Sequence, residues 1–228
     1  MTPPETLPSA TVHVGDTAKL MLLQRVGGPV ADDLQSHLQP MLLLDELLRV
    51  TLARPELDAQ ALRKHTEWIR PAVQGAMKAC AAAAEWLLPL PGASTPSAQL
   101  AAECAALLRP EFELCGLRVE LECEGEALAV GRAPGRTMLC AVLAHAGDHA
   151  EGPERIVMQL KHRDGLCEVR VSRRPATGAV ATDFLRPGQA PLAWGDLLAL
   201  AAREGVPLRR ESDGTLVLEL AAAPGAAS

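Results

Sequence analysis

Residues 32–48 read DDLQSHLQPMLLLDELL, and their apolar side chains recur at intervals of three and four. On a helix, side chains at this spacing lie along one face. The pattern continues on both sides, so a helix is predicted from Val30 to about Ala53. Only Asp45 interrupts its apolar seam, which consists of Val30, Leu34, Leu38, Met41, Leu48 and Leu52.

A second long helix is predicted from about Ala59 to Leu88, after a turn at ARPEL. Pro55 suits the first turn of a helical element, and Asp58 can act as its N-cap. Pro71 is expected to kink this helix. Its predicted inner face holds Leu62, Ile69, Val73, Ala76, Cys80, Ala83 and Leu87.

Two consecutive amphipathic helices joined by a short turn predict an antiparallel hairpin over residues 30–91. A single hairpin leaves the flanks of both seams exposed. Two hairpins in a homodimeric four-helix bundle would cover these flanks. The alternative is that the hairpin packs on the C-terminal half of its own chain.

The residues before the hairpin, 1–29, are interpreted as a separate N-terminal segment. The first fifteen are rich in Pro, Thr and Ser and are expected to be loose, with TVHV (residues 11–14) as a candidate edge strand. Asp16 is a candidate cap for a short helix. Gly27, Gly28 and Pro29 are expected to end that helix.

The pattern changes after PGASTPSAQ, residues 91–99, which has the composition of a linker. Residues 97–222 then mix helix and strand signals, with helices predicted at 98–108, 136–146 and 193–204. Two predicted strand pairs turn at Asp164-Gly165 and Asp213-Gly214, dipeptides that two-residue hairpin turns favour. This order predicts an α+β two-layer sandwich behind the helical hairpin.

The composition argues against several classes of function. The net charge is −6 and there is no block of Lys and Arg, so nucleic acid is not an expected partner. No apolar run approaches the about 20 residues of a membrane span, and no secretory signal is visible, so a cytoplasmic protein is expected. The usage of Ala, Leu, Arg and Pro is typical of a GC-rich bacterium. The six cysteines form no close pair and are expected to be reduced and buried.

The helix around residues 32–48 resembles the phosphoacceptor helix of sensor histidine kinases. That helix runs His-Glu-Leu-Arg-Thr-Pro-Leu and, two turns further on, Ala-Glu-Leu-Leu. Asp33 aligns without a gap on the acidic residue after the histidine, but the position of the histidine itself holds Asp32. The other matching positions are Leu34, Leu38, Met41, Glu46, Leu47 and Leu48.

With the order of the later elements, the resemblance extends over about residues 30–220. It is nearer to the soluble, dimeric histidine phosphotransferases, which have both domains of the kinases but do not bind ATP. The resemblance implies a dimerisation hairpin followed by a degenerate ATPase-like α/β domain.

The same resemblance implies a degenerate nucleotide pocket. Two asparagines of the kinases' ATP-lid helix correspond to Ala141 and His145, and Arg173 lies near the aspartate that receives the adenine amino group. A guanidinium only donates hydrogen bonds and cannot replace that aspartate. Trp194 and Asp196 occupy the glycine-rich phosphate turn, where a carboxylate would repel phosphate. No nucleotide or other cofactor is expected.

Two histidines of the hairpin are candidates for a replaced phosphoacceptor. His37 lies five residues after Asp32, which turns it by about 140° around the helix. It is interpreted either as a solvated helix histidine or as an alternative phosphoacceptor. His65 is expected inside the bundle or at its interface.

Two further motifs have weaker implications. His145 and His149 have the spacing of a metal-binding helix, but Ala146 stands where a metalloprotease has Glu, so no metal is expected. GRAPGR, residues 131–136, lacks the Lys and Ser or Thr of a phosphate-binding loop. It is predicted to be a tight turn with Arg132 and Arg136 in solvent.

The resemblance favours a non-catalytic homodimer that binds and regulates a two-component partner, either a response-regulator receiver domain or a histidine kinase. The expected contact residues are Asp32, Asp33, Gln35, Ser36 and Gln39. A second hypothesis is a histidine phosphotransferase that relays phosphate between receivers through His37. A third is an ATP-dependent protein with divergent nucleotide motifs.

Overall fold

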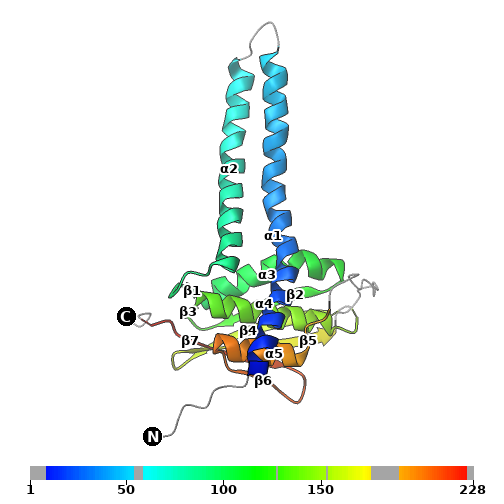
Figure 1. Ribbon diagram of the computed structural model, residues 1–228, viewed down its shortest axis with the longest axis vertical. Coiled ribbons are helices and arrows are strands. Elements are labelled where there is room, and N and C mark those ends of the chain that lie inside the picture. Colours follow the sequence, from blue (N-terminus) through cyan, green and yellow to red (C-terminus); the bar gives the residue numbers. More distant parts are fainter. Residues whose placement is uncertain (1–8, 54–58, 127, 153, 176–189, 225–228) are drawn as a thin grey trace. The chain divides into compact units, whose positions relative to one another are not determined.

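The computed structural model describes residues 9–53, 59–126, 128–152, 154–175 and 190–224. The chain forms two compact units (Figure 1). One contains residues 27–89, and the other contains residues 1–26 together with 90–228. Helix α1 belongs to both, because the boundary falls at Val26 and Gly27 within it.

Helix α1 (Ser9–Leu52) is one continuous helix of 44 residues, so the predicted strand at residues 11–14 and the predicted break at Gly27-Gly28-Pro29 are both wrong. Pro29 lies inside the helix, where its missing N–H removes a single backbone hydrogen bond. Packing before and after this point outweighs that loss, since Leu22, Val26 and Leu44 are all buried. The helix-breaking residues instead mark the boundary between the two units.

The helical hairpin is confirmed, with α2 (Ala59–Leu87) running beside α1 in the cyan and blue ribbons of Figure 1. The facing residues repeat at alternating intervals of three and four, as in left-handed helix pairs. On α1 they are Val30, Leu34, His37, Met41, Leu44, Leu48 and Thr51. On α2 they are Leu62, His65, Ile69, Ala72, Ala76, Ala79, Ala83 and Trp86.

The predicted seam is therefore wrong at some of its positions. Leu38 and Leu52 are exposed, while His37 and Thr51 take the places that face α2. These polar residues are accommodated because each has a partner on the other helix: the His37 ring lies against Gly75, and Thr51 lies near His65. On α2, Cys80 and Leu87 are likewise exposed, and their neighbours Ala79 and Trp86 face inward.

The second unit is built on a mixed five-stranded sheet of order β2-β4-β5-β7-β6. Its strands are β2 (Arg118–Glu124), β4 (Glu154–Arg163), β5 (Leu166–Pro175), β6 (Leu208–Arg210) and β7 (Leu216–Ala221). Strands β2 and β4 are parallel, and the other pairs are antiparallel. A separate pair joins β1 (Ser94–Pro96) to β3 (Ala129–Gly131), so part of the predicted linker is a strand.

Three helices complete the second unit: α3 (Ser97–Leu114), α4 (Arg132–Asp148) and α5 (Trp194–Glu204). One face of the sheet is continuously apolar and buried, formed by Ile156, Met158, Leu160, Cys167, Val169, Val171, Leu216, Leu218 and Leu220. The other face carries charged side chains such as Glu168, Arg170 and Glu219. The predicted α+β two-layer sandwich is thus confirmed.

The two predicted hairpin turns differ in outcome. Asp164 and Gly165 have φ of 50° and 75°, as a two-residue turn requires, so this prediction is confirmed. Between β6 and β7, Arg210 pairs with Leu216, which leaves residues 211–215 as a longer loop. Only Gly214 has a positive φ there, of 85°.

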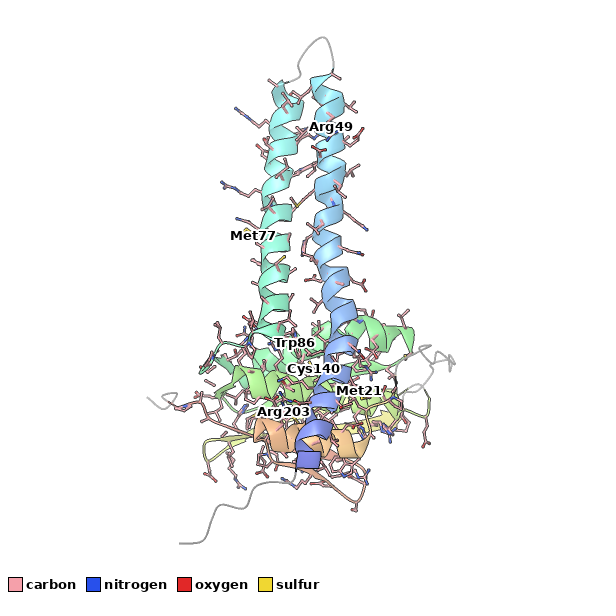
Figure 2. The ribbon with its side chains drawn as sticks, in the orientation of Figure 1. Met21, Arg49, Met77, Trp86, Cys140 and Arg203 are labelled. Carbon is pink, nitrogen blue, oxygen red and sulfur yellow. The ribbon has the colours of Figure 1, made fainter. Side chains whose placement is uncertain are left out.

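Residues of α1 before the unit boundary pack on the helices of the second unit, so the interpretation of residues 1–29 as a separate segment is wrong. Ala18, Leu22 and Val26 are buried on this part of α1. At its start, Asp16 forms an ion pair with Arg203 on α5, which Figure 2 labels. One turn on, Lys19 Nζ lies 2.9 Å from a Glu204 carboxylate oxygen.

Candidate functional site

The residues expected to contact a partner share the exposed surface of α1. Asp32, Asp33, Gln35, Ser36 and Gln39 are all exposed, and apolar Leu38, Leu42 and Leu43 are exposed beside them. The Ser36 hydroxyl donates to the Asp33 carbonyl oxygen at 2.7 Å. This surface therefore mixes carboxylates, amides and leucines.

His37 lies at the edge of the helical interface, with a side chain that is 38% exposed, so the predicted solvated histidine is in part covered by α2. A Cβ atom added at Gly75 of α2 would be only 2.4 Å from His37 Nδ1, which shows how closely the ring approaches that backbone. The other ring nitrogen, Nε2, lies 3.8 Å from an Asp33 carboxylate oxygen, one helical turn earlier. Any chemistry at His37 would therefore use Nε2, because α2 covers Nδ1.

Gly75 can be tested as the residue that makes room for His37. We expect Gly75→Ala to lower the free energy of unfolding by about 1–3 kcal/mol, because the added methyl group overlaps the ring. Gly28→Ala is the matched control, since nothing lies within 4 Å of a Cβ there and alanine favours helix. Urea denaturation measures both, and His37→Ala should restore the stability of Gly75→Ala. Equal effects of the two glycine substitutions would contradict this assignment.

His65 lies in the same interface, as predicted. Its Nε2 lies 3.4 Å from the Thr51 hydroxyl, and its ring meets Trp68 edge-on with centroids 6.4 Å apart. His65 thus joins the two helices near the turn of the hairpin.

Two of the three residues predicted for a degenerate nucleotide pocket, His145 and Arg173, line a cavity of about 200 Å³ in the second unit. His149, Trp194 and Arg210 line the same cavity. Ala141 does not line the cavity and is fully buried in the core. Small-molecule sites typically have volumes of about 300–1,000 Å³, so this cavity is small for a nucleotide.

His145 is fixed in orientation. Its Nδ1 lies 2.6 Å from the Leu192 carbonyl oxygen, which accepts a hydrogen bond only if Nδ1 carries the proton. Burial lowers the pKa of His145, and the nearby His149 and Arg210 act in the same direction, against the bond to Leu192. The His145 ring lies against that of His149, with centroids 4.1 Å apart and an angle of 36° between the ring planes.

Trp194 and Asp196 begin α5, where the kinases have their glycine-rich turn. The Asp196 carboxylate accepts a hydrogen bond from the Ala193 N–H at 2.9 Å, so it caps this helix. The Trp194 ring lies under the guanidinium of Arg210, whose central carbon is 5.1 Å from the ring centroid. Arg210 was missed from the sequence because β6 is far from α4 and β5 along the chain, and two adjacent arginines on a short strand do not indicate a site.

The GRAPGR segment is not the predicted turn, because Gly131 ends β3 and residues 132–136 begin α4. Arg132 donates to the Thr95 hydroxyl at 3.0 Å and pairs with Glu103 at 2.9 Å. Arg136 is buried, so the expectation that it is solvated is wrong. Arg132 thus ties α4 to β1 and α3.

A buried charge cluster was also missed. Arg25 of α1 donates through Nε to Glu111 of α3 at 2.7 Å and through Nη1 to Asp148 of α4 at 2.6 Å. Burial alone lowers the pKa of Arg25, but the hydrogen bonds to Asp148 and Glu111 outweigh it and raise the pKa above its usual value. Asp148 also accepts from the Leu192 N–H at 2.9 Å, and Leu192 in turn holds His145.

The structure also bears on metal binding and on membrane-spanning helices. Within the described ranges, no group of three or more His, Cys, Asp or Glu is placed to hold a metal ion. No helix in the described part of the chain is both long and apolar enough to cross a membrane.

Comparisons with known proteins give matches among solved structures alone. No family model matches the sequence, and no curated protein matches it. A structure described as a bacterial phosphotransferase is 14% identical, with 96% of this chain and 100% of that chain covered and a TM-score of 0.38. A histidine kinase of Acinetobacter baumannii is 10% identical, with 82% and 96% covered and a TM-score of 0.42.

A mycobacterial sensor histidine kinase is 11% identical, with 56% of this chain and 94% of that chain covered and a TM-score of 0.40. Similarities at this level assign no function and no residue role. The described elements form a helical hairpin and an α/β sandwich, in the order that the sequence predicted.

Proposed function

We propose that this protein is a non-catalytic, histidine-kinase-like homodimer that binds and regulates a receiver domain or a histidine kinase. The observation that carries the proposal is the hairpin surface. An exposed stripe of leucines continues along α1, while Asp32 occupies the position where a phosphoacceptor histidine would be. The small cavity at the place of the nucleotide supports the non-catalytic part.

The homodimer part rests on apolar side chains that the hairpin does not cover itself. On α1 these are Leu38, Leu42, Leu43, Leu47, Val50 and Leu52, and on α2 they include Trp68 and Met77. Contiguous apolar surface of this kind marks an interaction site in a folded protein. A second hairpin would bury it in the manner of a four-helix bundle.

Leu42 and Leu43 give the sharpest test, because they are 73% and 63% exposed. We expect Leu42→Glu with Leu43→Glu to convert a dimer into a monomer, since the buried carboxylates would lack partners. Analytical ultracentrifugation at micromolar concentration measures this. Leu114→Glu is the matched control, because Leu114 is also 63% exposed but lies on α3. A wild-type monomer would contradict the homodimer.

Partner binding is tested separately with the exposed polar residues of α1. The purified protein should retain a receiver-containing protein or a histidine kinase from native cell extract, identified by mass spectrometry. Gln35→Arg with Gln39→Arg should abolish retention, whereas Lys78→Glu on α2 should not. If the captured set contains no two-component protein, the proposed partner class is wrong.

A second function is a phosphotransferase acting through His37, whose Nε2 is the ring nitrogen that α2 does not cover. An uncovered imidazole nitrogen can act as a nucleophile toward phosphate. Radiolabelled phosphate from a phosphorylated receiver should then appear on this chain and be lost in His37→Ala. Label that persists in His37→Ala but is lost in Asp32→Ala would identify an acyl phosphate instead. Absence of label supports the non-catalytic proposal.

A further inference from the structure

The cavity beside α4 and α5 has two arginines in its wall, although the chain carries a net charge of −6. It measures about 200 Å³. Arg173 comes from the end of β5 and Arg210 from the end of β6. Three side chains with aromatic rings line the same cavity: His145, His149 and Trp194. Two positively charged side chains thus line one small cavity of a protein whose net charge is negative.

Arg210 is held in a way that leaves its donors available. The central carbon of its guanidinium lies over the Trp194 ring, 5.1 Å from the centroid, and this cation–π contact occupies none of its N–H donors with a hydrogen-bond acceptor. No ion pair to Arg210 forms among the residues that the structure describes. Its neighbour Arg209 is the contrast, because it lies 2.9 Å from Glu168 and also pairs with Glu219.

Arg173 is also only weakly engaged. Its Nη1 lies 3.6 Å from a Glu154 carboxylate oxygen, which is beyond hydrogen-bonding distance. The two arginines can therefore both turn donors toward a ligand in the cavity. Each guanidinium group is planar and can donate two parallel hydrogen bonds. A carboxylate or a phosphate suits such a donor, because it can accept both bonds through two oxygens.

The rest of the cavity is lined mainly by aromatic rings and apolar side chains. His145 has its Nδ1 bonded to Leu192 and lies against the tilted ring of His149, and both imidazole rings line the cavity. Val171 and Leu216 close the cavity from the sheet. A ligand that fills this space needs an apolar, flat body as well as an anionic head.

We propose that this cavity binds a small anion, a single aromatic ring carrying one carboxylate or phosphate group. The ring would lie among Trp194 and the two histidines, and the anionic group would bond to Arg173 and Arg210. The volume suits a ligand of one ring better than a nucleotide, because small-molecule sites typically have about 300–1,000 Å³. The proposal is independent of dimerisation and of partner binding.

The test is a titration with benzoate and with phenyl phosphate, followed by NMR of the tryptophan indole signals and by calorimetry. We expect saturable binding, with the signal of Trp194 shifted and those of Trp68 and Trp86 unmoved. The tighter of the two compounds identifies the preferred anionic group. Benzamide and inorganic phosphate are the matched probes that lack the charge and the ring, respectively, and each should bind at least about tenfold more weakly.

Substitutions then locate the site. Arg210→Ala should weaken binding by at least about tenfold, and Arg173→Ala should do the same. Arg209→Ala and Arg174→Ala are the neighbouring controls, and both should stay within about twofold. Arg210 is exposed, so its loss is not expected to unfold the protein, and circular dichroism checks this.

Three outcomes would overturn the proposal. The first is no binding of either compound at millimolar concentration. The second is benzamide or inorganic phosphate binding as tightly as the aromatic anions. The third is an effect of Arg209→Ala equal to that of Arg210→Ala, which would indicate a general effect of surface charge.

Discussion

Replacing Arg25 by methionine is expected to lower the free energy of unfolding by about 3–5 kcal/mol, because it leaves Glu111 and Asp148 as buried carboxylates without their shared cation. The side chain of Glu111 is 2% exposed and that of Asp148 is 13% exposed, so water replaces little of the lost interaction. Urea denaturation followed by circular dichroism measures the change. An expected loss of this size makes the cluster a major determinant of how α1 is held on α3 and α4.

Arg49 provides the matched control on the same helix. It forms an ion pair with Asp45 at 2.9 Å, but its side chain is 73% exposed. Figure 2 labels Arg49 on α1. Exposed pairs of this spacing contribute about 0.3–0.5 kcal/mol, so Arg49→Met should change stability by no more than that. Comparable effects of the two substitutions would contradict the buried role of Arg25.

The cluster also allows a rescue experiment. Adding Glu111→Gln and Asp148→Asn to Arg25→Met removes both orphaned charges while keeping hydrogen-bonding groups. We expect the triple variant to regain part of the lost stability, because the penalty comes mainly from uncompensated buried charge. No recovery would show that packing of the arginine side chain accounts for the loss.

The sequence predicted the elements where the hydrophobic period was long and regular. The two helices of the hairpin and the β4–β5 turn at Asp164-Gly165 are confirmed, since local pattern and turn chemistry determine them. The seam was wrong by one residue at His37 and Thr51, because the pattern of apolar residues alone favours Leu38 and Leu52. The inward placement of those polar side chains depends on Gly75 and His65 of the other helix, which no local pattern reveals.

The course of α1 was missed for a related reason. Gly27, Gly28 and Pro29 are a strong local signal for a helix end, and buried packing on both sides overrides it. The same limit applies to the cavity. His145 and Arg173 were found from the order of elements, whereas Arg210 reaches the cavity only through the pairing of β6 with β7. Contacts between distant segments thus account for what the sequence did not predict.

The second large effect is expected at Phe112 of α3, whose ring is 2% exposed and packs against Gly147 of α4. A Cβ added at Gly147 would be 2.6 Å from a carbon of that ring, so no side chain fits between them. Phe112→Ala should lower the free energy of unfolding by about 3–5 kcal/mol, through lost burial and the cavity left behind. Leu114→Ala, at an exposed position two residues away, should change it by about 0.5 kcal/mol or less.

The close contact of Phe112 and Gly147 predicts that substitutions at the two positions are not additive. Gly147→Leu alone should destabilise the protein by about 1–3 kcal/mol, because the ring cannot move away within a packed core. In the Phe112→Ala background the same leucine should instead raise stability, since it enters the space that the ring has vacated. Thermal and urea denaturation of the four proteins in this cycle measure the coupling. Simple additivity would mean that α3 and α4 separate to accept the new side chain, and that the glycine is not what sets their distance.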